Sequence, residues 1–316
     1  MREQTGRACG KVILFGEHSV VYGGPAIAIG IDRGASARAS EPETSTSRLR
    51  VRDWKVEVVA NDPEQDLGMA FGALLAASNL TRPIDVEAQT ELPPGAGLGC
   101  SAALGVAIAR ALDPIASIDT IVLRGAAWER IFHGNPSGVD TAAAARGGAI
   151  AFRRGHEVER IPLRTSFTLA IGHSGLASST RSMVESVARQ RERRPEIVEK
   201  TFDAIGSIVS NGRLALEAND LPAVGKLMDM NQMLLSGLML STPEIEQLCA
   251  IARHEGSHGA KLTGAGGGGC VVALVSSASA GERITAAWRR AGFKAFATSV
   301  GHEECASKSA PIEAAS

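Results

Sequence analysis

Two glycine clusters, at residues 95–99 and 264–269, constrain the fold of this chain more than any other feature. Glycine lacks a Cβ, so it is used where the backbone turns sharply or approaches another group closely, and ordering a glycine-rich segment costs much conformational entropy. The first cluster joins a strand-like to a helix-like segment, and the second joins two strand-like segments. We expect both to be ordered loops at a binding site; the alternative for each is an ordinary glycine-rich turn.

The first cluster, in the sequence PPGAGLGCSAA from residue 93, predicts an anion-binding loop. The free backbone N–H groups of such a loop and of the following helix N-terminus suit phosphate oxygens. The segment is not a Walker A loop, because no Gly-Lys-Ser/Thr ends it. The second cluster contains a literal G-x-G-x-x-G at Gly264, Gly266 and Gly269, but residues 271–275 are apolar and predict a strand where a dinucleotide fingerprint requires a helix. We interpret it as a loop that approaches a ligand from the second half of the chain.

The opening segment KVILFGEHSVVYGGPA, from residue 11, sets polar side chains beside an apolar strand. Lys11, Glu17 and His18 would be costly to bury without partners, so their density at the end of a strand indicates a site. The alternative is an ordinary strand and turn with a surface ion pair.

A third polar segment, WERIFHGNPSGVD from residue 128, contributes two carboxylates. Asp140 is expected in the first turn of a helix, where the helix dipole favours the ionised form that a general base requires. Ser137 is the expected cap of that helix. Taken singly, Asp140 is better interpreted as a surface acid that stabilises the helix dipole, Glu129 as a solvated helix acid and His133 as a structural histidine.

Length and charge narrow the choice of partner. A chain of 316 residues suits two modest domains with a cleft between them. With 33 Lys+Arg against 34 Asp+Glu, no field of one sign would attract nucleic acid or a membrane surface, so a small-molecule partner is expected. Five scattered cysteines without a C-x-x-C pair argue against a disulfide framework or a zinc site and favour the cytoplasm. No export or membrane-spanning segment is apparent.

Hydrophobic periodicity predicts an α+β chain that is β-rich early and helix-rich late. We place a domain boundary at the polar corner near residue 165, giving domains 1–165 and 166–316. The predicted strands cover 8–15, 25–31, 35–40, 49–60, 82–90, 149–153, 157–162, 167–171, 270–275 and 294–299. The predicted helices cover 64–79, 100–112, 117–132, a segment from Ser137 to near Gly147, 179–191, 195–218, 221–236, 243–254 and 279–291.

The four polar and glycine-rich segments, in this order between residues 11 and 270, resemble the motifs of the GHMP small-molecule kinases. HSVVYG after the opening strand and HGNPSGVD are similar to the mevalonate kinases of that family in particular. The resemblance implies a two-domain α+β fold, with a ribosomal-S5-like N-terminal domain, a ferredoxin-like C-terminal domain and the active site in the cleft between them. It also implies ATP and Mg²⁺ as cofactors and mevalonate as the acceptor, and leaves a homodimer open.

Carried over residue by residue, the resemblance implies roles for individual side chains. Asp140 would take the proton of the acceptor hydroxyl, and Lys11 would stabilise the transferred phosphoryl group. Glu129 and Ser101 would hold Mg²⁺. The nucleotide phosphates would be held by Pro93, Gly95, Ala96, Gly97, Leu98, Gly99, Cys100, Ser101 and Ala102. The acceptor pocket would be lined by Glu17, His18, Ser137, Thr180, Gly264 and Ala265.

Two departures from the family pattern stand out. Cys100 replaces the first of two serines that usually follow the Gly-Leu-Gly sequence. The Val-Pro-Arg-Ser-Thr-like segment reads Leu-Ala-Ser-Ser-Thr-Arg at residues 176–181 and lacks the Pro-Arg pair, so an arginine that could bind phosphate or carboxylate is displaced or absent. Two alternatives remain: another kinase of this family, acting on a different hydroxyl, on phosphomevalonate or on a sugar, and a non-catalytic ligand sensor. A sensor would be expected to lose one of Lys11, Glu129 and Asp140, and all three are present.

Overall fold

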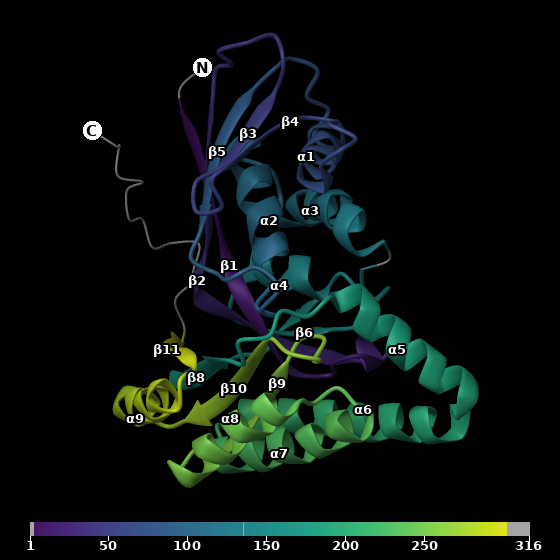
Figure 1. Ribbon diagram of the computed structural model, residues 1–316, viewed down its shortest axis with the longest axis vertical. Coiled ribbons are helices and arrows are strands. Elements are labelled where there is room, and N and C mark those ends of the chain that lie inside the picture. The colour runs from purple at the N-terminus through teal and green to yellow at the C-terminus, as the bar shows by residue number, and fades with distance from the viewer. Residues whose placement is uncertain (1–2, 135, 302–316) are drawn as a thin grey trace.

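The computed structural model describes residues 3–134 and 136–301, which form two β-sheets, each covered by helices (Figure 1). The first half contains a seven-stranded sheet in the order β4-β3-β5-β2-β6-β7, with β1 paired to β2. Its strands are β1 (Gln4–Phe15), β2 (Ala26–Ser40), β3 (Arg48–Val51), β4 (Val56–Val59), β5 (Asp85–Thr90), β6 (Ala149–Phe152) and β7 (Glu159–Arg160). Its helices are α1 (Asp66–Ala77), α2 (Cys100–Leu112), α3 (Ile118–His133) and α4 (Val139–Arg146), with a short 3₁₀ turn, η1 (Ser19–Tyr22).

The long strand β2 corrects one expectation, because it runs continuously where two strands were predicted. The N-terminal part of β2, residues 26–29, pairs with β6, and its C-terminal part, residues 35–40, pairs with β5. Its other edge pairs with β1 along most of its length. The β1–β2 register shifts between Cys9 and Gly10, opposite the polar residues that separate the two predicted strands. A β-bulge absorbs that irregularity and bends the strand without ending it.

Helix α2 is buried on nearly all sides between the sheet and the helices α3 and α4. It consists mainly of Ala, Gly, Val, Ile and Leu, which lets it lie close to β1: a Cβ on Gly6 would collide with the backbone of Ala107. This packing fixes the N-terminal end of α2, which carries the first glycine cluster.

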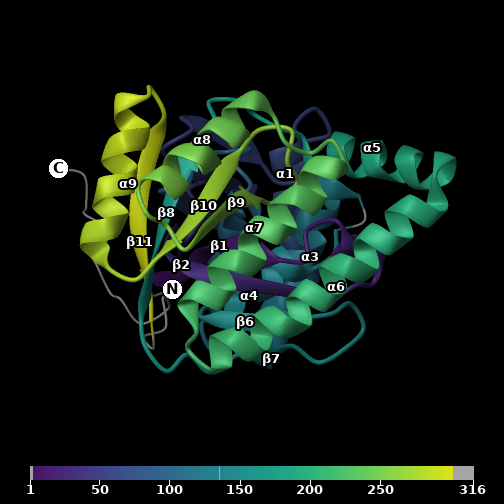
Figure 2. The same ribbon diagram turned by 90° about the horizontal axis from the view of Figure 1, so that it is seen from below.

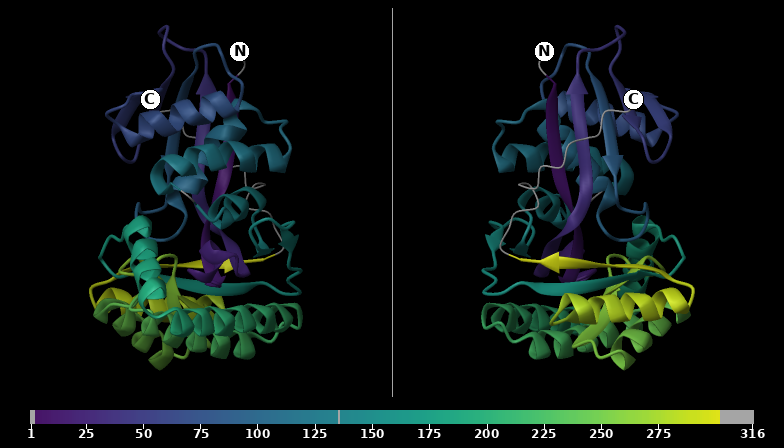
Figure 3. Two further views of the ribbon diagram at one scale, coloured as in Figure 1. Left: turned by 90° about the vertical axis from the view of Figure 1, so that its right-hand side faces the viewer. Right: turned by 90° about the vertical axis from the view of Figure 1, so that its left-hand side faces the viewer.

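The second half contains a four-stranded antiparallel sheet in the order β11-β8-β10-β9. The strands are β8 (Phe167–His173), β9 (Gly259–Thr263), β10 (Cys270–Val275) and β11 (Lys294–Val300). The helices are α5 (Thr180–Arg193), α6 (Pro195–Glu217), α7 (Leu221–Gly237), α8 (Pro243–His254) and α9 (Ala278–Arg290). Helices α7, α8 and α9 pack on the face of this sheet that points away from the first half, and α6 lies beside α7 in the same layer and contacts β1 and β2 (Figures 2 and 3). None of the helices in the described ranges is long and apolar enough to cross a membrane.

The two halves are joined by direct hydrogen bonds. The Thr263 hydroxyl accepts from the backbone N–H of Ile13 at 2.8 Å and donates to its carbonyl at 3.1 Å, so the end of β9 is tied to the end of β1. The Asp32 backbone N–H donates to the Thr298 hydroxyl at 3.4 Å. The observed elements confirm the predicted α+β class. The boundary at residue 165 falls between β7 and β8 and remains a proposal.

Candidate active site

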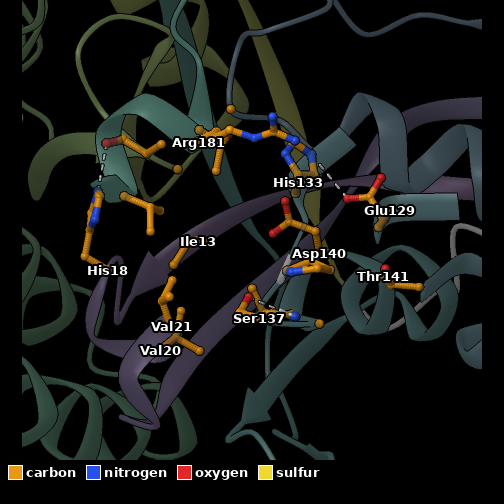
Figure 4. A pocket seen from close by; sticks show the side chains of 18 of the residues that line it. Ile13, His18, Val20, Val21, Glu129, His133, Ser137, Asp140, Thr141 and Arg181 are labelled. Atoms are coloured by element: carbon orange, nitrogen blue, oxygen red, sulfur yellow. Dashed lines mark hydrogen bonds and ion pairs between the residues drawn. The ribbon is translucent and has the colours of Figure 1, made fainter. Parts of the chain in front are cut away.

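A cavity of about 410 Å³ lies where the two halves meet (Figure 4). Its walls come from β1, η1 and the ends of α3 and α4 in the first half, and from α5 and the second glycine cluster in the second half. A volume in this range is typical of small-molecule sites. The sequence-predicted polar segments therefore meet at one place, although they are more than 100 residues apart in the chain.

At the base of the cavity, Lys11 and Asp140 form an ion pair. The Lys11 Nζ lies 3.0 Å from the Asp140 Oδ1 and donates to the Gly97 carbonyl at 3.1 Å. The Lys11 side chain is almost fully buried, whereas that of Asp140 is 35% exposed and faces the cavity. Gly99 leaves room for the lysine, because a Cβ there would lie 2.8 Å from the Lys11 Cγ. The lysine is thus held in one orientation beside the first glycine cluster.

Asp140 is positioned by the start of α4. Gly138, with φ +93°, is the N-cap, and the Ser137 hydroxyl accepts from the Val139 N–H at 3.3 Å. The prediction that Ser137 caps this helix is wrong by one residue, because Gly138 occupies the cap and the Ser137 hydroxyl supports the turn just before it. The carboxylate lies in the first helical turn, where the helix dipole stabilises its charge.

The first glycine cluster forms a loop whose backbone conformation strongly favours glycine. Gly95, Gly97 and Gly99 all have φ between +69° and +77°. A Cβ on Gly97 would lie 2.7 Å from the Thr263 carbonyl, so this loop also packs directly against the start of the second glycine cluster. The loop enters α2 at Cys100, so its N–H groups and the helix N-terminus form an arrangement suited to phosphate oxygens.

The other residues predicted to hold the phosphates do not present their side chains to the loop surface, so only their backbone could contribute to such a site. The side chains of Ala96, Leu98 and Ala102 are buried in the core, and Pro93 is half-buried. The Cys100 thiol donates to the Leu92 carbonyl at 3.4 Å and points away from the loop. Burial raises the pKa of Cys100 to about 11. The Ser-to-Cys departure therefore alters a core contact.

Glu129 and Ser101 lie together beside the Lys11–Asp140 ion pair. The Ser101 hydroxyl donates to the Glu129 Oε1 at 2.5 Å and accepts from the Trp128 indole N–H at 3.1 Å. Burial raises the pKa of Glu129 to about 7; the Ser101 hydrogen bond works against this shift and the charge of Asp140 adds to it. A buried carboxylate without a cation close enough to offset its desolvation is a natural position for a metal ion.

His133 lies one helical turn after Glu129, with its Nε2 3.5 Å from the Glu129 Oε2. Burial lowers its pKa, and the charges of Lys11 and Arg181 lower it further against the effect of Asp140. His133 lines the cavity, although the sequence favoured a structural role for it.

His18 is held in a strained backbone conformation, with φ +60°, at the opposite wall. Its Nε2 is 2.8 Å from the Ala265 carbonyl, which can only accept, so this nitrogen carries the proton. The Nδ1 is buried and has no hydrogen-bond partner among the described residues. Burial lowers the pKa of the imidazole, so the ring is neutral and the Nδ1 can accept a hydrogen bond.

Glu17 does not line the cavity, which corrects the expectation that it contacts the acceptor. Its side chain is fully buried, paired with Lys261 and bonded by the Asn231 Nδ2 at 3.0 Å. The turn at Gly16 sends Glu17 inward, towards β9 and α7, and His18 towards the cavity. Thr180, Gly264 and Ala265 do line it, as expected.

Several lining residues were not singled out from the sequence. Arg181 follows Thr180 in the first turn of α5 and faces the cavity. An apolar wall is formed by Ile13, Val20, Val21, Val139 and Val184. These valines and isoleucine read as ordinary core residues in the sequence, so no local signal marked them. Arg181 was visible only as the end of the segment that departs from the family pattern.

Known proteins with the same organisation support one assignment. Residues 67–148 match the family model of the GHMP kinase N-terminal domain, and residues 213–294 match that of the GHMP kinase C-terminal domain. The mevalonate kinase of Pyrococcus abyssi is 34% identical over 84% of this chain and 86% of its own length. That of Aeropyrum pernix is 34% identical over 96% of this chain and 97% of its own.

A solved structure of similar fold is the mevalonate kinase of L. major in complex with R-mevalonate. It has a TM-score of 0.81 and 28% identity, and the alignment covers 95% of this chain and 96% of that one. Two matched domains and near full-length relatives leave no other assignment for the fold. The chain therefore belongs to the GHMP kinase family of ATP-dependent small-molecule kinases, among relatives that are mevalonate kinases.

Proposed function

We propose that this protein transfers the γ-phosphoryl group of ATP to the primary hydroxyl of (R)-mevalonate, giving 5-phosphomevalonate and ADP. The observation that carries the proposal is the Lys11–Asp140 ion pair, at 3.0 Å, between the glycine loop and a cavity with one apolar wall. Relatives named mevalonate kinases match most of the chain and direct the choice of acceptor.

Asp140 is the proposed general base. Its carboxylate faces the cavity in the first turn of α4, and its Oδ1 lies 3.0 Å from the Lys11 Nζ. A hydroxyl placed against the free carboxylate oxygen would give up its proton as the oxygen attacks phosphorus. Such a base contributes on the order of 10²–10⁴-fold to the rate.

Lys11 and the glycine loop stabilise charge on the transferred group. The lysine ammonium is fixed between Asp140 and the Gly97 carbonyl, so little reorganisation is needed when negative charge develops nearby. Because phosphoryl transfer needs alignment and charge neutralisation more than covalent chemistry, these fixed donors match the reaction.

Glu129 and Ser101 fit the requirements of Mg²⁺. Their oxygens are adjacent, and the raised pKa of Glu129 reflects a buried carboxylate that a cation would compensate. Mg²⁺ at nucleotide sites takes one or two carboxylate or hydroxyl ligands and completes its shell with phosphate and water. When bound, it would neutralise charge on the phosphate oxygens.

The acceptor is tested by ADP release with mevalonate, galactose, homoserine and phosphomevalonate compared side by side. We expect turnover with mevalonate, and phosphorus NMR of the product to show a phosphate monoester on the primary carbon. Negligible turnover with mevalonate, or clear preference for another acceptor, would reject the proposal in favour of another kinase of the family. No turnover with any acceptor would favour a ligand sensor.

A further inference from the structure

The cavity contains one cation that the proposed mechanism does not use. Arg181 lies in the first turn of α5, and its side chain lines the cavity. Its Nη2 donates to the Phe132 carbonyl at 3.2 Å; within residues 3–134 and 136–301 the guanidinium forms no ion pair. A guanidinium has five N–H donors in a planar fork. Most of that fork is therefore open to a ligand.

The other cavity cation is already committed. Lys11 is bound to Asp140 and to the Gly97 carbonyl at the base of the cavity. Figure 4 shows Arg181 beside His133 on the α5 side of the cavity, with Val20 and Val21 across from it. The charge of Arg181 also lowers the pKa of His133, as expected for neighbours.

The cavity needs such a cation if its ligand is an acid. Three carboxylates line it, those of Glu129, Asp140 and Glu185, against the two cations. An anionic group entering this cavity would be repelled unless a free positive charge received it. Arginine binds carboxylates through two parallel hydrogen bonds, and the N-terminus of α5 adds a positive potential at the same place.

We infer that Arg181 binds the carboxylate of the acceptor and so determines the preference for an acid over a neutral alcohol. The inference rests on the proposed function, since mevalonate has its carboxylate at the opposite end from the phosphorylated hydroxyl.

The test compares mevalonate with its primary amide, which keeps the shape and removes the charge. Because a hydrogen bond to a charged group is worth roughly 1.5–3 kcal/mol, the wild-type protein should prefer the acid by about 10- to 100-fold in kcat/KM. In Arg181→Met this preference should fall to about threefold or less. Turnover of the amide and the KM for ATP should stay near the wild-type values. Arg181→Lys should keep part of the preference, because a lysine retains the charge without the fork.

Arg189→Met is the matched control, since it removes the same charge from an exposed position two turns along α5, outside the cavity lining. It should leave the acid preference unchanged. A raised KM for ATP in Arg181→Met with the acid preference intact would assign the guanidinium to the γ-phosphate and overturn the inference. An equal loss with both acceptors would also overturn it. A wild-type protein that turns over mevalonate without preferring it to the amide contradicts the inference alone, whereas no turnover of mevalonate contradicts the proposed function as well.

Discussion

Replacing Lys261 with methionine should strongly destabilise the protein, because it would strand a buried carboxylate. Lys261 and Glu17 are both fully buried, and the ammonium also donates to the Leu262 carbonyl at 2.6 Å. In the variant, Glu17 would keep only the hydrogen bond from Asn231, at 3.0 Å. Removing one partner of a buried ion pair costs about 3–5 kcal/mol. That is a large part of a typical stability of about 5–15 kcal/mol.

The free energy of unfolding is measured by urea titration, followed by circular dichroism and by the fluorescence of Trp54 and Trp128 in the first half and Trp288 in the second. Arg50→Met is the control, since its partner Glu57 lies 2.7 Å away in an exposed pair and the loss should be about 1 kcal/mol or less.

The double variant Glu17→Leu/Lys261→Met removes both charges and should recover at least half of the loss, because apolar residues often replace buried pairs at little cost. A loss below about 1 kcal/mol in Lys261→Met would refute the reasoning. So would a double variant no more stable than the single one.

Three further outcomes follow from the site. Asp140→Asn should lower kcat by about 10²–10⁴-fold while nucleotide binding, measured by calorimetry, is retained; near wild-type kcat would contradict its role as base. Gly97→Ala should lose far more turnover than Gly95→Ala, because both have positive φ but only at Gly97 would the Cβ lie 2.7 Å from the Thr263 carbonyl; equal losses would mean that backbone strain alone matters. Burial raises the pKa of the Cys100 thiol to about 11, so the thiol is protonated at pH 8. In a Cys305→Ser background, Cys100 should therefore resist thiol reagents at pH 8, with or without ATP, until the protein unfolds. Fast labelling that ATP prevents would place the thiol at the phosphates after all.

Most helices and strands could be predicted because their signals are local. The predicted helix 100–112 coincides with α2, and the predicted strand 270–275 with β10. The division of β2 into two predicted strands failed for a nonlocal reason: a bulge against β1 lets the strand continue through a polar interruption. The residues of β1 that enforce this pairing lie more than 20 positions earlier in the chain.

The candidate site could be predicted to different degrees for different residues. Lys11 and Asp140, 129 positions apart, were paired through the resemblance, and they form an ion pair in the structure. Glu17 was assigned to the cavity through the same resemblance, together with His18, but adjacent residues in a turn can face opposite sides. Its direction depends on Lys261, 244 residues away, and on the burial of both charges.

The amino-acid sequence by itself determined the order of elements, the two glycine loops and the set of polar residues that the site draws on. These depend on periodicity, on glycine's backbone freedom and on motif spacing, all of which are properties of short segments. Only the tertiary structure decided which polar side chains face the cavity. Glu17 was expected to face the cavity but is buried, and Arg181 was given no role from the sequence but lines the cavity. Both outcomes depend on burial and ion pairing with neighbours that are distant in the chain. The second half supplies both the lysine that draws Glu17 inward and the arginine that faces the cavity.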